Sequence, residues 1–207
     1  MRRILVANLK GGCGKTTLAT TLASALAARG DLVGLVDADR QKSALRWLKA
    51  RSEALPLIAA ADWTKGIEAE PKGLSHLVID APGGLKGDKA EDLVEIADMV
   101  VVPVLPSVFD THSTGKFLER IEDLKAIRKG RTTIALVVNR ARPRTKALNE
   151  VEVALGELGR PASATITDRG LYAELAREGR GLFDVKGKAF EPMKAQWQPL
   201  LAMIDAL

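Results

Sequence analysis

The sequence predicts an α/β fold in which a three-layer, doubly wound, mostly parallel β-sheet is flanked by helices. Short apolar runs rich in Val and Ile alternate along the chain with longer segments of helical periodicity. The apolar runs are nearly unbroken, which is typical of parallel strands covered on both faces. The chain has 207 residues, is 46% hydrophobic and shows no linker-like stretch or internal repeat. We therefore expect one domain over residues 1–207.

The first half of the chain begins with a strand, ILVA, and a helix that follows it. That helix places Leu18, Leu22, Ala25 and Leu26 on one face, and Gly30 is suited to ending it. Strands are predicted at 4–7, 32–39, 55–60 and 76–82, and helices at 16–29, 43–54, 63–70 and 89–97.

The second half repeats the alternation, beginning with the buried run MVVVPV. Strands are predicted at 99–104, 132–139 and 162–167, and helices at 114–129, 146–158, 170–178 and 192–206. His112 is expected on the loop after MVVVPV, and Trp47 and Trp63 are expected in the core. Folds of this kind bind ligands at the carboxyl ends of their strands, so the residues that follow the strands are the first candidates for a site.

Composition narrows the classes of protein that fit. Cys13 is the single cysteine, so one chain cannot build an internal disulfide framework or a multi-cysteine metal site. No apolar run reaches the ~18 residues of a membrane span, and the apolar run at the N-terminus is too short for a signal peptide. We therefore expect a soluble, cytoplasmic protein. The net charge of +5 raises the odds of a nucleic-acid partner only slightly.

The turn between the first strand and the first helix predicts a phosphate-binding loop. It reads Lys10-Gly11-Gly12-Cys13-Gly14-Lys15-Thr16-Thr17. The glycines allow a tight turn whose N–H groups point at phosphate oxygens, and the helix adds the positive end of its dipole. Lys15 would reach the β- and γ-phosphates of ATP, and Thr16 would place a hydroxyl on Mg²⁺. The alternative is a glycine-rich turn that carries a lysine by chance. The usual pattern has one lysine, whereas this loop has a second, Lys10.

Three aspartates follow predicted strands and could serve a metal ion. Asp80 ends HLVID before a turn of small residues, as does a Walker B aspartate that holds Mg²⁺ directly or through water. Asp37 and Asp39 end another strand as D-A-D, so alternation along the chain points both side chains at the phosphate site. One could join the Mg²⁺ shell, and the other could orient or deprotonate the attacking water. The alternative is that these two carboxylates cap the following helix.

Together, K-G-G-C-G-K-T-T, V-D-A-D-R-Q and V-I-D-A-P-G resemble the deviant Walker A ATPases of the ParA/MinD type. The resemblance extends over nearly the whole chain and is to the short ParA branch. It implies an ATP-dependent homodimer in which Lys10 contacts phosphate bound to the other subunit; a second contact within the same subunit is the alternative. It also implies that Asp39 positions the water and Asp37 sits in the Mg²⁺ shell. Arg40 stands where the family's D-x-D-P-Q stretch has proline, so we expect a less rigid turn here.

The resemblance assigns two further residues. Asn139, at the end of a predicted strand, matches the asparagine that reads the adenine edge, since its amide can both donate and accept; a turn-forming residue is the alternative. Cys13 occupies the variable position of the loop. A redox role for Cys13 is a minor alternative, because Lys15 and the helix N-terminus could lower the pKa of its thiol.

The family carries out several tasks, and basic clusters favour ATP-dependent, non-specific DNA binding that segregates or positions a plasmid, chromosome or protein cargo. The candidate contacts are Arg140, Arg142, Arg144 and Lys146. Further cations lie at 125–131 and at Lys186 and Lys188. They could neutralise phosphates without reading bases, although a solvated basic face is the alternative. The resemblance implies a partition or adaptor protein that stimulates hydrolysis, and association with the nucleoid in the ATP state. Plasmid partition and positioning of a protein assembly are nearly balanced, with the short chain favouring partition slightly.

Two other tasks within the superfamily stay open. A MinD-like membrane cycler would use an amphipathic C-terminal helix, but residues 195–207 contain no basic residue and fit a helix packed on the sheet better. A small-molecule ligase would need a second substrate pocket, for which the sequence shows no convergent polar residues. We therefore expect no membrane partner.

Overall fold

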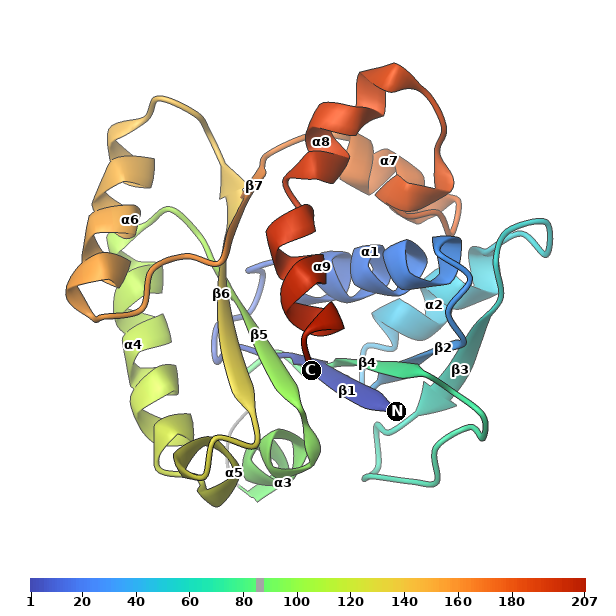
Figure 1. Cartoon of the computed structure of the whole chain (residues 1–207), viewed down its shortest axis with the longest axis horizontal. Helices are drawn as coiled ribbons and strands as arrows, with labels where there is room; N and C mark the ends of the chain where they lie inside the picture. Colours follow the sequence, from blue (N-terminus) through green and yellow to red (C-terminus); the bar gives the residue numbers. More distant parts are fainter. Residues whose placement is uncertain (85–87) are drawn as a thin grey trace.

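The computed structural model describes residues 1–84 and 88–207. Within these residues, the centre of the fold is a seven-stranded sheet with the order β3-β2-β4-β1-β5-β6-β7 (Figure 1). Every neighbouring pair of these strands is parallel. The strands are β1 Arg2–Val6, β2 Val33–Asp37, β3 Ile58–Asp62, β4 His76–Asp80, β5 Met99–Val104, β6 Thr133–Ala141 and β7 Ala164–Thr167. The predicted parallel sheet is confirmed.

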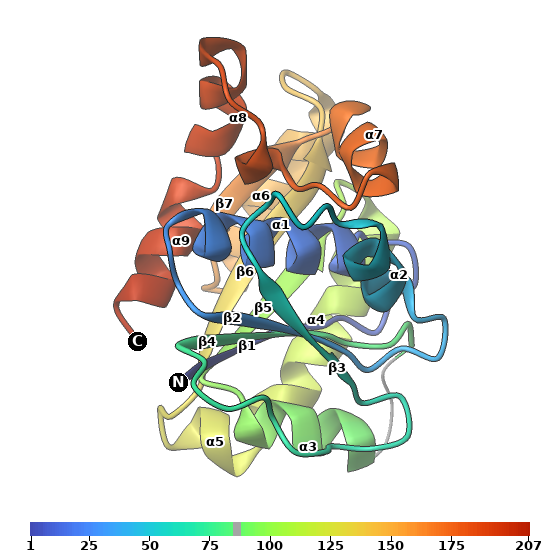
Figure 2. The same ribbon diagram turned by 90° about the vertical axis from the view of Figure 1, so that its right-hand side faces the viewer.

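Helices cover both faces of the sheet, as Figure 2 shows nearly edge on. One face carries α1 Lys15–Ala28, α2 Ser43–Ala50, α7 Leu171–Arg177, α8 Glu191–Ala195 and α9 Gln198–Asp205. The other carries α3 Asp88–Ile96, α4 Val108–Glu122, α5 Lys125–Arg128 and α6 Lys146–Glu157. Successive strand residues alternate between the two layers: Ile4 and Val6 join the α1 core, while Leu5 joins the core beneath α3 and α4. Burial on both faces explains why the strands contain few polar residues.

The strand register sets the position of the site. Asp80 is level with Val6 on one side and with Asp37 on the other. Parallel strands end at one edge, so the ends of β1, β2 and β4 bring the phosphate loop and two aspartates together.

The predicted helix at 63–70 is wrong, because the chain leaves β3 through a bend. The backbone N–H of Trp63 donates to the carbonyl of Asp37 at 2.9 Å, and the ring is completely buried. The Asp62 carboxylate accepts from the backbone N–H and the hydroxyl of Thr64 at 3.0 and 2.6 Å. This local turn competes with helix formation, as Asp side chains often do.

The predicted helix at 114–129 is two helices, and it begins earlier than expected. Helix α4 starts at Val108, so His112 lies on a helix rather than on a loop. An extended Leu124, with ψ of 142°, separates α4 from α5. The Glu95 carboxylate accepts from the backbone N–H of Ala126 at 3.1 Å and so supports the start of α5.

Two other predicted helices are shorter than expected. Helix α2 ends at Ala50 because Arg51 is extended and its guanidinium forms a buried pair with Asp184 at 2.7 Å. The region 192–206 is split into α8 and α9, with Pro199 in the first turn of α9, where its missing N–H costs nothing.

The C-terminal helix packs in the core, as expected. Trp197, Leu200, Leu201 and Ile204 are completely buried against the α1 side of the sheet. Among the described helices, none is long and apolar enough to cross a bilayer.

Candidate nucleotide-binding site

The phosphate loop joins β1 to α1 at the carboxyl edge of the sheet. Gly12 and Gly14 adopt left-handed backbone angles, with φ of 76° and 92°. These angles favour glycine and turn the chain sharply into α1. A Cβ at Gly14 would also collide with the side-chain amide of Asn139. Gly11 is exposed, and Thr16 and Thr17 are half-buried in the first turn of α1. The predicted turn thus lies between β1 and α1, and α1 begins at Lys15, one residue earlier than predicted.

The two lysines of the loop point in different directions. Lys15 is buried, and its Nζ donates to the carbonyl of Lys10 at 2.9 Å, so its cation lies inside the loop. The side chain of Lys10 is 37% exposed and leaves the loop, and its Nζ lies 2.6 Å from Oδ2 of Asp110. Asp110 sits in the first turn of α4 and is itself buried. Sequence reasoning missed Asp110, because the residue belongs to no motif.

Cys13 is buried, and its Sγ lies 3.3 Å from the carbonyl oxygen of Lys10. Burial raises the pKa of the thiol, while the Lys15 cation opposes that shift. This direction counts against the minor redox alternative for Cys13, because desolvation outweighs the nearby charge.

Asp37 caps the helix that follows it. Its carboxylate accepts from the backbone N–H groups of Asp39 and Leu45, each at 3.0 Å. Leu45 lies in the first turn of α2, so the helix-capping alternative is observed for Asp37. Burial raises the pKa of Asp37, and these backbone donors oppose the shift.

Asp39 is half-buried and links two loops. Its Oδ1 accepts from the backbone N–H of Gln41 at 2.9 Å, and its Oδ2 accepts from the backbone N–H of Gly83 at 2.9 Å. Gly83 follows β4 and Asp80. Asp39 therefore lies at the same edge as the phosphate loop, where sequence alternation placed it.

Asp80 is completely buried, and within the described residues neither of its carboxylate oxygens forms a hydrogen bond. The Thr16 hydroxyl interacts with this carboxyl without reaching hydrogen-bond geometry. Burial raises the pKa of Asp80 to about 7; Thr16 and Lys15 oppose the shift, and the negative charges of Asp37 and Asp39 add to it. A buried carboxylate with free oxygens is an expensive arrangement unless a cation or proton compensates it.

These residues fit Mg²⁺. The described residues contain no group of three or more His, Cys, Asp and Glu side chains able to hold a metal. Mg²⁺ does not need such a group, because it is usually held by one or two carboxylates together with substrate phosphates and water. The free oxygens of Asp80 and the hydroxyl of Thr16 supply that protein share at the mouth of the phosphate loop.

Asn139 lies beneath the phosphate loop. Its Nδ2 donates to the carbonyl of Cys13 at 2.8 Å, and the residue is 5% exposed. One amide proton and the amide oxygen remain for another partner. The structure thus adds a second task to Asn139, which is to hold the loop against β6.

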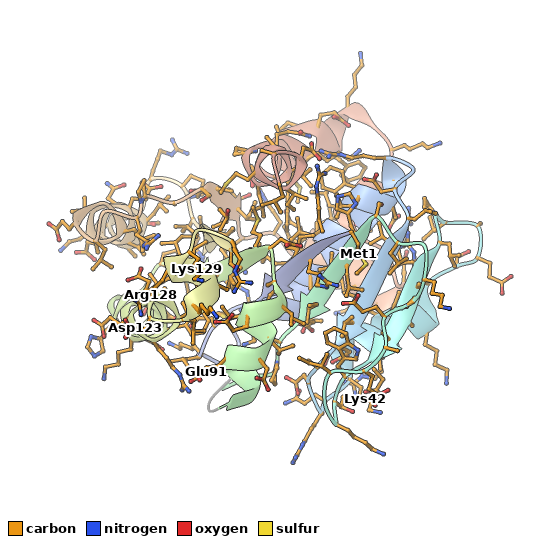
Figure 3. The ribbon with its side chains drawn as sticks, turned by 60° about the horizontal axis from the view of Figure 1, so that its bottom comes forward. Met1, Lys42, Glu91, Asp123, Arg128 and Lys129 are labelled. Carbon is orange, nitrogen blue, oxygen red and sulfur yellow. The ribbon has the colours of Figure 1, made fainter. Side chains whose placement is uncertain are left out.

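The basic clusters do not form one surface. Arg128 and Lys129 lie on and just after α5, next to Asp123 at the end of α4 (Figure 3), and this end precedes β6. Arg140 lies near the other end of β6 and Arg142 directly follows it; the strand has nine residues and therefore spans ~30 Å. Lys186 and Lys188 lie on the opposite face, near α8.

Two of the four cations at 140–146 lie near carboxylates. Arg142 lies 3.4 Å from Asp168, and Lys146 lies 3.4 Å from Glu150. Arg140 and Arg144 form no ion pair with any described residue, and both have left-handed backbone angles, with φ of 52° and 62°. Such angles are uncommon for non-glycine residues and often mark functional segments.

Comparison with known proteins decides the family. Residues 4–182 match the CobQ/CobB/MinD/ParA nucleotide binding domain. The chain belongs to this family. Maintenance of carboxysome distribution protein A from Halothiobacillus neapolitanus is 31% identical over 189 residues, which cover 88% of this chain and 87% of the relative. The protein of the same name from Gloeobacter kilaueensis is 32% identical over 209 residues, which cover 99% and 94%.

The solved structures agree on the fold. The apo McdA structure from Cyanothece matches with a TM-score of 0.78 at 17% identity, over 97% of this chain and 99% of that one. The ParA/MinD resemblance and the doubly wound fold are therefore confirmed, and the chain is a ParA/MinD-type nucleotide-binding ATPase.

Proposed function

We propose that this ATPase hydrolyses ATP to ADP and phosphate with Mg²⁺, and that it does so as an ATP-dependent homodimer. The observation that carries the proposal is the divergence of the two loop lysines. The cation of Lys15 lies within its own loop, whereas Lys10 leaves the loop and is partly exposed. A cation that leaves its own loop is suited to the phosphates of a second copy, as an arginine finger is.

Each residue then has a separate task. Lys15 and the loop N–H groups bind the phosphates, and Asn139 contacts the base with its remaining amide atoms. Thr16 and Asp80 would hold Mg²⁺, and Asp37 would sit in the shell of the ion. The ion would neutralise charge on the phosphate oxygens. Asp39 orients a water for attack on the γ-phosphorus and accepts its proton, while the bond to the ADP oxygen breaks. Lys10 of the second copy stabilises the developing charge.

We further propose that the ATP dimer binds DNA non-specifically and positions a cargo, with a partner protein stimulating hydrolysis. The exposed cations Arg140 and Arg144 support this, because they lie at the nucleotide edge of the sheet without an ion-pair partner among the described residues. Both named relatives distribute carboxysomes, which favours a protein assembly over a plasmid as cargo. Burial of the apolar face of α9 argues against the membrane alternative.

A DNA-shift assay in ATP, ADP and no nucleotide, at ~100 mM salt, tests the DNA step. We expect a shift only with ATP, and a weaker shift for Arg140→Ala combined with Arg144→Ala. The matched control is Arg128→Ala combined with Lys129→Ala, at the far end of β6, which should leave the shift unchanged. A DNA shift of equal size in ATP, in ADP and without nucleotide would refute control of DNA binding by ATP. Equal losses of DNA binding in both double variants would refute the assignment of Arg140 and Arg144 to the DNA-binding surface.

A further inference from the structure

The strand segment that contains Asn139 carries a bulge. Val138 of β6 pairs with Thr165 of β7. The next pair is Ala141 with Thr167, so β6 contains one residue more than β7 between the two pairs. Bulges redirect side chains and are common beside binding sites. This one covers the position of Asn139, whose amide reaches the phosphate loop at 2.8 Å. The end of β7 therefore lies next to the amide that we assigned to the base.

The turn that leaves β7 stays at this edge of the sheet. It comprises residues 167–170 and leads into α7. The backbone N–H of Asp168 donates to the carbonyl of Ala141 at 2.9 Å, which ties the turn to the end of β6. Nucleotides bind at the carboxyl ends of parallel strands. The 167–170 turn is therefore in position to contact the nucleoside part of a nucleotide whose base lies at Asn139.

A side chain from the C-terminal region holds the start of this turn. Gln196 lies in the corner between α8 and α9, and Figure 1 shows this corner beside the end of β7. Its Oε1 accepts from both the backbone N–H and the hydroxyl of Thr167, at 2.9 and 3.2 Å. Because both donors meet one oxygen, Gln196 fixes the backbone and the side chain of Thr167 together.

The neighbouring residue in the corner, Trp197, holds the other end of the turn. Its Nε1 donates to the hydroxyl of Tyr172 at 3.0 Å, and the two ring centroids lie 6.3 Å apart. Tyr172 belongs to the first turn of α7, directly after the 167–170 turn. Trp197 is completely buried in the core beside α1. The corner is thus anchored in the core and bonded to the chain on both sides of the turn.

We propose that Gln196 is a positioning residue for the nucleoside part of the bound nucleotide. It holds the 167–170 turn where the turn contacts the nucleoside, while the phosphate loop binds the phosphates independently of this corner. The proposal rests on the proposed function, since it takes the base to lie at Asn139. Loss of the accepting oxygen of Gln196 should therefore weaken binding of a whole nucleotide and spare binding of its phosphates alone.

The test is titration calorimetry of the full chain with ADP and with inorganic pyrophosphate, each with Mg²⁺. Pyrophosphate matches the phosphate part of ADP and lacks the nucleoside. We expect Gln196→Leu to weaken ADP binding about tenfold, because two hydrogen bonds are lost, and to change pyrophosphate binding less than about twofold. Gln196→Glu keeps an accepting oxygen, so its ADP affinity should stay within about threefold of the parent chain.

Two further variants sharpen the comparison. Gln198→Leu makes the same exchange at an exposed position in the first turn of α9, and should leave both affinities unchanged. Thr167→Val removes only the hydroxyl donor, so ADP binding should weaken about threefold while pyrophosphate binding does not change. Thr167→Val decides the question if Gln196→Leu does not fold.

Equal losses of ADP and pyrophosphate binding would show a general structural role for Gln196 and overturn the proposal. Unchanged ADP affinity in Gln196→Leu or Thr167→Val, an equal loss in Gln198→Leu, or a Gln196→Glu chain as weak as Gln196→Leu would also overturn it. A parent chain that binds neither ligand would instead refute the proposed nucleotide site, and the role of Gln196 with it.

Discussion

Replacing Asp80 with Asn should stabilise the protein at alkaline pH. The carboxyl is completely buried, and burial raises its pKa from 3.8 to about 7. The folded state therefore holds a proton that the unfolded state releases at lower pH. Stability associated with this group is fully present below pH ~4 and is lost as the pH rises to about 7. Asn has nearly the same shape and cannot ionise, so the variant escapes this loss.

The magnitude follows from the two pKa values. Their difference corresponds to ~4 kcal/mol at full ionisation, at 1.36 kcal/mol per pH unit. Between pH 5.5 and pH 8 the folded carboxyl loses its proton, and the advantage of Asp80→Asn should grow by ~2 kcal/mol. The constant cost of burying an amide cancels in this comparison.

The assay is urea unfolding followed by tryptophan fluorescence, at pH 5.5 and 8, in EDTA and in Mg²⁺. Asp92→Asn is the matched control, because Asp92 is exposed. With ADP present, Mg²⁺ should stabilise the parent chain at pH 8 relative to EDTA and should have less effect on Asp80→Asn, since a bound ion adds to stability only where its site exists. An equal stability change at both pH values would refute the assigned cause, which is burial of an ionisable group.

Three further substitutions test the other contacts. Lys15→Gln should abolish nucleotide binding measured by calorimetry, whereas Lys10→Ala should retain it within about threefold and lose dimer-dependent turnover; equal loss of binding in both would place Lys10 in its own loop's site. Asp39→Ala should bind ATP and accumulate as a dimer in sedimentation while turnover falls at least ~100-fold, and normal turnover would remove Asp39 from catalysis. Arg51→Ala should lower the free energy of unfolding by ~3–5 kcal/mol, because it leaves the buried carboxylate of Asp184 unpaired, and a loss below 1 kcal/mol would show that water reaches that site.

Local patterns predicted most of the sheet because its signals lie within single segments. An unbroken apolar run reports burial on both faces, and the loop from Lys10 to Thr17 identifies itself by spacing. The wrongly predicted helices lie where contacts with residues distant in the sequence determine the local structure. Trp63 leaves its strand to fill the core, and Glu95 fixes the start of α5, so periodicity alone extended or invented helices there.

The functional site likewise contains residues that motifs identify and residues that only tertiary contacts identify. Lys15, Thr16 and Asp80 could be placed from the sequence, because each stands in a motif next to a strand. Asp110 could not, since its role depends on a contact with a residue 100 positions earlier. The helix-capping bonds of Asp37 and the bond from Asn139 to the loop are likewise tertiary, and only the folded chain reveals them.

The two partners of the hydrogen bond between the backbone N–H of Gly83 and Oδ2 of Asp39 differ in their sensitivity to substitution. One end is a side chain that substitution can delete, and the other is a main-chain group that every amino acid except proline would retain. The hydrogen bond that links the segments after β2 and β4 should therefore survive substitution of Gly83 far better than substitution of Asp39. Gly83→Pro would remove this hydrogen bond without changing any carboxylate.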